Sequence, residues 1–319
     1  MKAVQITGSK GSHQITLTHS LPAPTAQGRD ILIKVCAAGI TADEVTWPEL
    51  YDSSNRVPGH DVSGIVEAVG PEYDGPAVVG DGVFAMLGTS TDQGSQADYA
   101  VVLPDEIAPK PASLSHAQAA ALPIPILTAW EAIFQHAELA SGSKVLVTGA
   151  SGAVGVMLVQ LASRLLGAHV TGLAAASNHA YVRDLGASHV LDYNSPDWES
   201  AVSEMDAVFD TVGGQTLAKS WNTVKKNGVV VTVADPPPPW ALGKEEPEEL
   251  RRYPDVRKVY FVVTSQGSTL SKVAALLEKG DVKPLPVKVF PAEDALAAWA
   301  YARKRGREGK AVIEFLAGD

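Results

Sequence analysis

The chain has 319 residues and a formal net charge of −10, with 45% hydrophobic and 19% charged residues. That length accommodates about two domains, each with its own hydrophobic core, and the composition is ordinary for a globular protein. The acidic balance argues against electrostatic binding to nucleic acid or to an anionic membrane. Cys36 is the only cysteine, which excludes an intramolecular disulfide and any metal site built from several cysteines.

The lengths of the apolar runs bear on location. No run approaches the roughly 20 residues that span a bilayer. The first residues, MKAVQITGSKGSHQITL, lack the apolar core of a signal peptide. We therefore expect a cytoplasmic protein without membrane contact.

The pattern of predicted elements changes along the chain. Residues 1 to about 112 contain short β-type runs separated by Gly, Pro and Asp. A capping box at Ser115 and Gln118 then predicts a helix. From Lys144 to about Val263, strand candidates alternate with helices, which predicts an α/β fold with a doubly wound parallel sheet. These candidates are KVLVT, AHVTGLA, SHVLDY, DAVFDTV, GVVVTVA and KVYFVV. The remaining tail predicts helix, strand, helix and strand.

The segment VLVTGASGAVG at 145–155 joins the first of these strands to an amphipathic helix through Gly149, Gly152 and Gly155. Glycines let backbone N–H groups come close to a phosphate, and the N-terminus of a helix carries about half a positive charge. This strand, turn and helix predict a nucleotide site, and the alternative is a purely structural turn.

The residues after the second strand bear on the kind of nucleotide. A fold that binds NAD places Asp or Glu about 20 residues past the glycines, where the carboxylate binds the ribose. The segment AAASN at 174–178 occupies this place, so no carboxylate repels a 2′-phosphate. This favours NADPH, although Arg183 is the only cation nearby in the sequence. A loop indifferent to the cofactor is the alternative.

A long segment, DPPPPWALGKEEPEELRRYPDV at 235–256, separates the fifth and sixth strand candidates. Long loops in compact domains are usually functional or mobile. Two interpretations stay open, a substrate lid and a solvated insertion.

Motifs spread over the chain form a specific set. They are AAGITADE at 37–44, VPGHDVSGIVEAVG at 57–70, GDGVFAM at 80–86, LTAWEAI at 127–133, the glycine turn, LGASHVLDY at 185–193, FDTVGG at 209–214 and GKAVIEF at 309–315. Together they resemble the medium-chain dehydrogenase/reductase superfamily, and within it the zinc-independent, quinone oxidoreductase-like branch. The resemblance covers essentially the whole chain.

This resemblance implies a fold and an activity. The fold has a GroES-like β-rich catalytic domain, formed by residues 1–114 and again by 264–319, and a Rossmann NADPH-binding domain at 115–263. The implied enzyme transfers hydride from NADPH to a quinone or an α,β-unsaturated carbonyl compound by 1,4-reduction. Two alternatives stay open, a pathway-specific ene or enoyl reductase and a non-catalytic NADPH-binding protein.

Zinc-dependent alcohol dehydrogenases of the same superfamily are the competing interpretation. By resemblance, the positions of their catalytic zinc ligands hold Thr41 and His60 here, with Ile124 near the third. Catalytic zinc needs three protein ligands and an open position, and only the histidine is present. We therefore expect no metal. His60 is then either a hydrogen-bonded turn residue or a group that touches substrate.

The substrate-lining stretch of the family corresponds to residues 41–55, TADEVTWPELYDSSN. Tyr51 lies close to the place of a tyrosine often found there, and its phenol can donate to an oxygen, although an ordinary loop tyrosine is the alternative. Thr41 stands where many quinone oxidoreductases have asparagine. Trp47 offers a flat wall for an aromatic acceptor. With His60, these three residues are the catalytic candidates.

The resemblance also assigns cofactor residues. Those at the pyrophosphate are Ser151, Gly152, Ala153 and Val154, and those at the adenosine phosphate are Ser177, Asn178 and Tyr193. Those that flank the nicotinamide half are Thr128, Val212, Ala234, Phe261, Val262 and Val263. Lys310 either reaches the cofactor or is a plain strand residue. Relatives that use NADPH often carry a cation at Ser177 and a serine at Ala175, so this chain departs from the pattern.

The expected partners are a small quinone or enone substrate and a second copy of the chain. The last strand candidate, KVYFVV at 258–263, is apolar and falls at the edge of the predicted sheet. An uncovered edge strand is a liability, and many relatives pair it with a second subunit. A homodimer through this strand is therefore the expected assembly.

Overall fold

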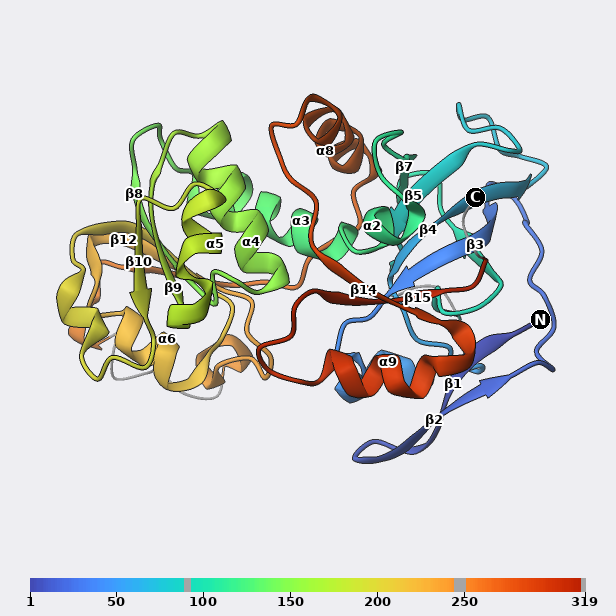
Figure 1. The fold of residues 1–319 in the computed structure, drawn as a ribbon, viewed down its shortest axis with the longest axis horizontal. Coiled ribbons are helices and arrows are strands. Elements are labelled where there is room, and N and C mark those ends of the chain that lie inside the picture. Colours follow the sequence, from blue (N-terminus) through green and yellow to red (C-terminus); the bar gives the residue numbers. More distant parts are fainter. Residues whose placement is uncertain (89–92, 244–250, 317–319) are drawn as a thin grey trace. The chain divides into compact units, whose positions relative to one another are not determined.

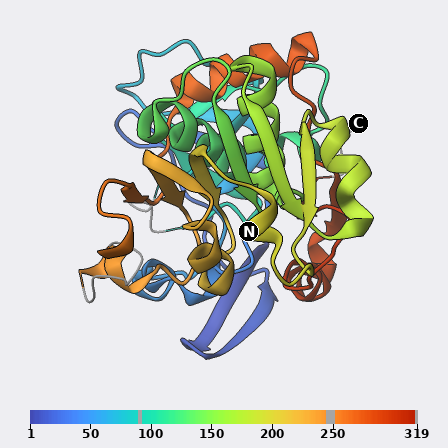
Figure 2. The same cartoon turned by 90° about the vertical axis from the view of Figure 1, so that its left-hand side faces the viewer.

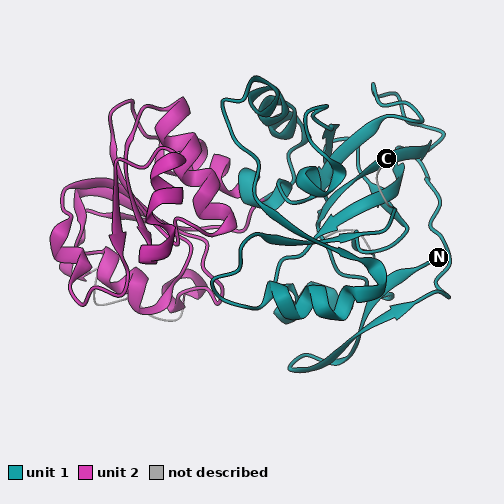
Figure 3. Cartoon of the chain, in the orientation of Figure 1, with its two compact units in different colours: residues 1–127, 264–319 teal, residues 128–263 magenta. Residues whose placement is uncertain are grey.

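The computed structural model describes residues 1–88, 93–243 and 251–316. The chain divides into two compact units (Figure 3), of which unit 1 is Met1–Leu127 with Thr264–Asp319 and unit 2 is Thr128–Val263. The sequence places the first boundary after residue 114. The structure places it after Leu127, because helix α2 (His116–Ala120) packs on the strands of unit 1. Unit 2 ends at Val263.

Unit 1 is built on one large β-sheet and a separate hairpin. The order in the sheet is β14-β15-β3-β4-β5-β7, with β6 also paired to β3 (Figure 1). All its pairs are antiparallel except β14 with β15. The strands are β1 (Ala3–Ser9), β2 (Ser12–Thr18), β3 (Ile31–Gly39), β4 (Asp61–Val69), β5 (Gly82–Met86), β6 (Tyr99–Val102), β7 (Ile107–Pro109), β14 (Val287–Pro291) and β15 (Lys310–Glu314).

The helices that the structure describes in unit 1 include α1 (Pro48–Asp52), α2, α8 (Gly267–Lys279) and α9 (Ala295–Ala302). Helix α9 packs on β14 and β15 with its buried face, and its Trp299 is fully buried. The Trp299 indole N–H donates to Gln96 Oε1 at 2.9 Å, so the polar edge of this core residue is satisfied. The tail of the chain thus completes the core of unit 1.

The capping box predicted before α2 is present. The Ser115 hydroxyl oxygen accepts from the Gln118 backbone N–H at 3.2 Å, and Gln118 Oε1 accepts from the Ser115 N–H at 3.1 Å. The next helix, α3 (Pro123–Glu131), begins at a proline. A backbone N–H at this first position would have no partner within the helix, so proline is tolerated there. Helix α3 continues as a π-helical segment, Ala132–Ala137.

Unit 2 contains the predicted doubly wound sheet. The order is β10-β9-β8-β11-β12-β13, and every pair is parallel (Figure 2). This order is that of the Rossmann fold, with strands one to three on one side of the switch point and four to six on the other. The strands are β8 (Lys144–Thr148), β9 (His169–Ala174), β10 (His189–Asp192), β11 (Met205–Asp210), β12 (Val224–Thr232) and β13 (Arg257–Tyr260). The helices are α4 (Ala153–Gln160), α5 (His179–Asp184) and α6 (Gly214–Ser220).

The burial of these strands explains their composition. Val145, Leu146 and Val147 of β8 are fully buried, as are Val208 of β11 and Val230 of β12. A parallel strand covered on both faces is apolar throughout, which is why the sequence identifies these inner strands. The edge strand β13 differs, because it is Arg257–Tyr260 and its first two residues are exposed. None of the described helices combines the length and the apolarity that crossing a bilayer requires.

Part of the long segment at 235–256 lies outside the described residues, namely 244–250. The preceding residues form a short 3₁₀ helix, Pro239–Leu242. The Lys258 ammonium lies 5.6 Å from the centroid of the Trp240 ring, so the start of this segment contacts the edge strand β13.

Candidate functional site

The glycine turn of unit 2 is as tight as its sequence suggests. Gly149 follows β8 with φ +62°, a conformation that favours glycine. A Cβ added to Gly155 would lie 2.1 Å from the Gly149 carbonyl oxygen, so the first turn of α4 packs directly on the end of the strand. Gly152 is the N-cap of α4, and its N–H donates to Gly149 O at 2.8 Å.

This geometry fits the diphosphate of a dinucleotide. Ser151, Gly152, Ala153 and Val154 lie at or just before the N-terminus of α4, where the first backbone N–H groups have no partner within the helix. Such N–H groups and the helix dipole together bind phosphate. Asn178 Nδ2 donates to Ser151 Oγ at 3.1 Å, so two of the predicted cofactor residues are in direct contact.

The residues predicted at the adenosine phosphate follow β9 and β10, and the segment 174–178 after β9 contains no carboxylate. Strand β9 ends at Ala174, and Ser177 after it is exposed. The ring of His179, which begins α5, lies with Nε2 3.3 Å from the Ala174 carbonyl oxygen. Tyr193 follows β10 and is 53% exposed. The surface after β9 therefore offers small and neutral groups.

The remaining predicted cofactor residues of unit 2 fall into two groups. Val212 and Val262 are exposed, whereas Thr128 and Ala234 are buried. Val212 and Ala234 follow the carboxyl ends of β11 and β12, the edge at which ligands bind in such sheets.

The segment after β13 holds the last two of these residues, Phe261 and Val263. The Phe261 ring packs against the His136 ring at a tilt of 41°, with ring centroids 4.4 Å apart. Arg257 of β13 donates to the His136 carbonyl oxygen at 3.0 Å. Strand β13 is thus tied to the π-helical segment that follows α3.

A buried carboxylate, Asp210, organises the same edge of the sheet. It accepts from the hydroxyls of Thr148 and Thr232, at 2.7 and 2.8 Å, and from the Gly213 N–H at 3.0 Å. Thr211 donates its hydroxyl to Thr148 O at 2.9 Å. These bonds connect the ends of β8, β11 and β12. The sequence analysis missed this role, because the motif FDTVGG does not show which distant groups its aspartate binds.

Lys310 lies in unit 1, on strand β15. Its side chain is 5% exposed and forms an ion pair with Asp61, whose other oxygen accepts from the Ile124 N–H at 2.7 Å. A contact between Lys310 and the cofactor would be additional to this ion pair. The role at the cofactor stays a prediction.

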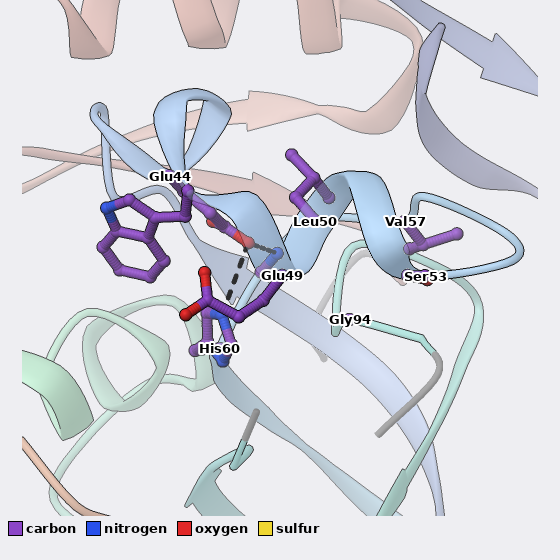
Figure 4. A pocket seen from close by; sticks show the side chains of 9 residues that line it. Glu44, Glu49, Leu50, Ser53, Val57, His60 and Gly94 are labelled. Carbon is purple, nitrogen blue, oxygen red and sulfur yellow. Dashed lines mark hydrogen bonds and ion pairs between the residues drawn. The ribbon is translucent and has the colours of Figure 1, made fainter. Parts of the chain in front are cut away.

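Unit 1 contains a pocket at the beginning of β4 (Figure 4). Two of the four catalytic candidates, Trp47 and His60, line it, and Thr41 and Tyr51 do not. The lining residues are Glu44, Trp47, Glu49, Leu50, Ser53, Val57, Gly59, His60 and Gly94. Figure 4 shows Glu44, Glu49 and His60 gathered at one part of this lining.

Tyr51 has an internal partner. Its hydroxyl donates to the Val45 carbonyl oxygen at 2.7 Å, and the Arg56 guanidinium lies 5.6 Å from the centroid of its ring. The phenol would have to leave Val45 to donate to a substrate. Thr41 contributes its carbonyl oxygen to the Glu44 N–H at 3.2 Å, within the turn that starts the pocket.

The His60 imidazole is held on both sides. Nδ1 lies 2.9 Å from the Leu87 carbonyl oxygen, which can only accept, so Nδ1 carries a proton. Nε2 lies 3.7 Å from Glu44 Oε1, and the Trp47 ring centroid is 5.5 Å away. His60 therefore presents Nε2 beside a carboxyl group and an aromatic ring.

Glu44 is a functional candidate that the sequence analysis missed. It is 2% exposed, and its Oε1 accepts from the Gly59 N–H at 2.5 Å. Its Oε2 is buried and has no hydrogen-bond partner among the described residues. Burial raises the pKa of Glu44 above its usual range, and His60 and the Gly59 N–H oppose that shift only in part. The sequence offers no local signal for this contact, since a glutamate in a turn is ordinarily solvated.

The residues at the zinc positions do not fit catalytic zinc. Thr41 and Ile124 replace two ligands, and an isoleucine side chain has no atom that binds zinc. The Ile124 backbone N–H donates to Asp61. In the described ranges, no three His, Cys, Asp or Glu side chains come together as a metal site would require.

A Rossmann sheet with a phosphate-binding turn and a GroES-like β-sheet unit together define a nicotinamide-dependent oxidoreductase. Comparison with known families agrees. The model described as "Alcohol dehydrogenase GroES-like domain" matches residues 27–112, and the one described as "Zinc-binding dehydrogenase" matches residues 185–313.

Individual relatives extend over nearly the whole chain. A "Probable zinc-binding oxidoreductase, mitochondrial" from Arthroderma benhamiae is 32% identical, over 94% of this chain and 92% of that protein. An "NADPH-dependent alkenal/one oxidoreductase, chloroplastic" from Arabidopsis thaliana is 31% identical, over 98% and 79%. The solved quinone oxidoreductase from Coxiella burnetii is 27% identical, with a TM-score of 0.85 over 99% of each chain. The chain belongs to the medium-chain dehydrogenase/reductase superfamily.

Proposed function

We propose that this protein is a zinc-independent, NADPH-dependent reductase of quinones or α,β-unsaturated carbonyl compounds. One observation carries the proposal: the dinucleotide turn is intact, whereas the zinc positions hold Thr41, His60 and Ile124. The names of the Arabidopsis and Coxiella relatives support this substrate class. The neutral segment after β9 supports NADPH over NADH.

The chain's own residues have three tasks in this reaction. The amides at Ser151–Val154 hold the diphosphate, and groups that follow the carboxyl ends of β11 and β12, among them the exposed Val212, orient the nicotinamide half. When bound, NADPH supplies the hydride. Hydrogen-bond donors of the protein stabilise the negative charge that develops on the acceptor oxygen, and a proton completes the reduction.

The test is the initial rate of oxidation of NADPH and of NADH, with a flat ortho-quinone and a simple enone as acceptors and EDTA present. We expect NADPH consumption that the chelator does not reduce. Loss of activity in EDTA, restored by zinc, would contradict the zinc-independent mechanism. NADPH binding without any turnover would favour a narrow biosynthetic substrate or a non-catalytic role.

We further propose a homodimer through β13 and a cytoplasmic location. Strand β13 lies at the edge of its sheet, and Val262 just beyond it is 68% exposed. Light scattering should give twice the mass of the chain, and Val262→Lys should shift it toward the monomer. Mass equal to one chain at all concentrations would overturn this assembly.

A further inference from the structure

The buried carboxylate of Asp210 connects the parts of unit 2 that would bind the two halves of the cofactor. Resting on the proposed function, we propose that Asp210 is a positioning residue for the nicotinamide half. It fixes the segments that follow β11 and β12 relative to the diphosphate turn, and in this way it determines how the nicotinamide is presented to the acceptor. This role is additional to the stability that Asp210 gives to the sheet.

The position of Asp210 in the sheet defines which part of the cofactor it influences. A Rossmann sheet consists of two mononucleotide-binding halves, and a dinucleotide lies across the carboxyl ends of its strands. Strand β8, which leads into the glycine turn, is the neighbour of β11 in the order of the sheet. Asp210 is the last residue of β11, so it lies where the two halves meet. The segments after β11 and β12 belong to the half that would bind nicotinamide.

The two oxygens of Asp210, which is 1% exposed, accept from different strands. Oδ1 accepts from the hydroxyl of Thr148 at 2.7 Å, at the end of β8. Oδ2 accepts from the hydroxyl of Thr232 at 2.8 Å, at the end of β12, and from the Gly213 N–H at 3.0 Å. Each of these groups directs a proton at the carboxylate, which only accepts. One planar group thus joins three neighbouring strand ends.

On the diphosphate side, these contacts hold the glycine turn. The Thr148 hydroxyl also accepts from the Thr211 N–H at 3.1 Å, and the Thr148 carbonyl oxygen accepts from the Thr211 hydroxyl at 2.9 Å. A Cβ added to Gly149 would lie 2.5 Å from the Thr211 hydroxyl oxygen and 3.0 Å from Val212 Cγ2. Val212 therefore packs on the turn itself, and its 51% exposure leaves part of the side chain open to a ligand.

On the nicotinamide side, the same carboxylate holds the backbone after β12. The Thr232 hydroxyl, which donates to Asp210, accepts from the Ala234 N–H at 3.2 Å. A Cβ added to Gly213 would lie 2.8 Å from the Ala234 Cβ, so the segments after β11 and β12 are in close contact. A displacement of Ala234 would therefore be transmitted to Gly213. The Thr232 hydroxyl is the group that connects this contact to the carboxylate.

The network can be divided at Asp210. The bonds of Thr148 hold the diphosphate turn, whereas the bonds of Thr232 hold the segment that follows β12. Hydride transfer depends steeply on the placement of the reacting atoms, and a displacement of about 1 Å can lower a rate roughly a hundredfold. We therefore expect loss of the Thr232 hydroxyl to impair the nicotinamide half while the adenosine half still binds.

The experiment compares Thr232→Val with Thr223→Val in the full-length protein. Both threonines are fully buried, and valine has nearly the same shape without the hydroxyl. Thr223 directly precedes β12, at the opposite end of the strand from Thr232, and its hydroxyl donates to the Ser220 carbonyl oxygen at 2.7 Å. The two valine variants thus remove the same kind of buried hydrogen bond, near the cofactor edge and away from it.

The ligands are NADPH and 2′-phospho-ADP-ribose, which is NADPH without its nicotinamide, and calorimetry gives both affinities. We expect Thr232→Val to weaken NADPH binding about fivefold, the equivalent of one hydrogen bond, and to leave the affinity for 2′-phospho-ADP-ribose unchanged. Turnover at saturating NADPH should fall roughly tenfold. Asp210→Asn should change the ratio of the two affinities in the same direction.

Two controls separate positioning from stability. Thr223→Val should lower stability to urea about as much as Thr232→Val and should change neither affinity nor turnover. Thr232→Ser, which keeps the hydroxyl, should bind NADPH as the unmodified protein does. Equal weakening of both ligands by Thr232→Val, or equal effects of the two valine variants, would overturn the positioning role. If the unmodified protein binds NADPH without turnover, the proposed function fails, and the ratio of the two affinities still decides the role of Asp210.

Discussion

The candidate sites of the two units consist of different chemical groups. In unit 2, the phosphate site consists of backbone amides, and the polar groups behind it are mutually satisfied around Asp210. In unit 1, the pocket contains a buried carboxyl oxygen of Glu44 without a partner, beside His60. A buried polar atom without a partner is costly, whereas a network whose members are all paired is stable. Among the described residues, the polar groups of unit 2 are therefore held more firmly than Glu44 in unit 1.

The largest expected effect tests whether Lys310 stabilises unit 1 through its ion pair with Asp61 or contacts the cofactor. Among the described residues, Lys310→Met leaves the buried Asp61 carboxylate with the Ile124 N–H as its remaining partner. We expect a loss of about 4 kcal/mol in the free energy of unfolding, measured with urea.

Lys226→Met is the control, since Lys226 pairs with Asp255 at the surface, where the effect should stay below about 1 kcal/mol. NADPH affinity of the folded Lys310→Met protein should be unchanged. A clear loss of affinity with little loss of stability would instead place Lys310 at the cofactor.

The next effect tests the rigidity of the glycine turn. The added Cβ in Gly155→Ala would meet three backbone atoms of Gly149 and Ala150, which cannot move independently. We expect a destabilisation of about 3 kcal/mol and a parallel loss of NADPH binding, followed by unfolding and fluorescence titration. Gly82→Ala is the control, because its nearest contact would be the flexible Lys110 side chain at 3.7 Å. Equal effects of both substitutions would disprove the tight turn.

A smaller effect is expected from the buried network. Asp210→Asn replaces an acceptor with an amide nitrogen that faces hydroxyl or N–H donors. If either threonine hydroxyl accepted from the new amide, its own proton would lose the Asp210 oxygen to which it now donates. We expect about 2 kcal/mol of lost stability by urea unfolding, with Asp192→Asn as the partly exposed control. No difference between the two variants would contradict the role of Asp210.

The smallest effect concerns the choice of cofactor. A carboxylate introduced by Ala175→Asp would repel a 2′-phosphate, and Ser177→Arg would attract it. We expect the ratio of NADPH to NADH dissociation constants to rise about tenfold in the first variant and to fall in the second, which corresponds to about 1.4 kcal/mol. A ratio that neither variant changes would show that residues 174–178 do not contact the ribose.

The sequence predicts local features of this molecule well. The six strands of unit 2 and the capping box at Ser115 depend on neighbouring residues, so the pattern of side chains is sufficient to find them. The glycine turn is equally local. The phosphate site of unit 2 was for this reason the most predictable part of the fold.

Contacts between distant segments were not predictable. Lys310 and Asp61 are 249 positions apart, and Leu87 reaches His60 across 27 positions. Glu44 lies in a stretch that the sequence assigns to the substrate, but its burial depends on the turn around Gly59. Such contacts follow from the topology of the sheet, and residue patterns within one segment do not encode them.

The pairing of β15 with β3 has a consequence for the order of synthesis. Residues 310–314 insert between β14 and β3, so the sheet of unit 1 is incomplete until the end of the chain has been made. Unit 2 is one continuous stretch, and it is available to fold earlier on the ribosome. Nascent chains that end near residue 300 should therefore hold a protease-resistant unit 2 beside an unfinished sheet, whose open strand β3 needs protection from aggregation.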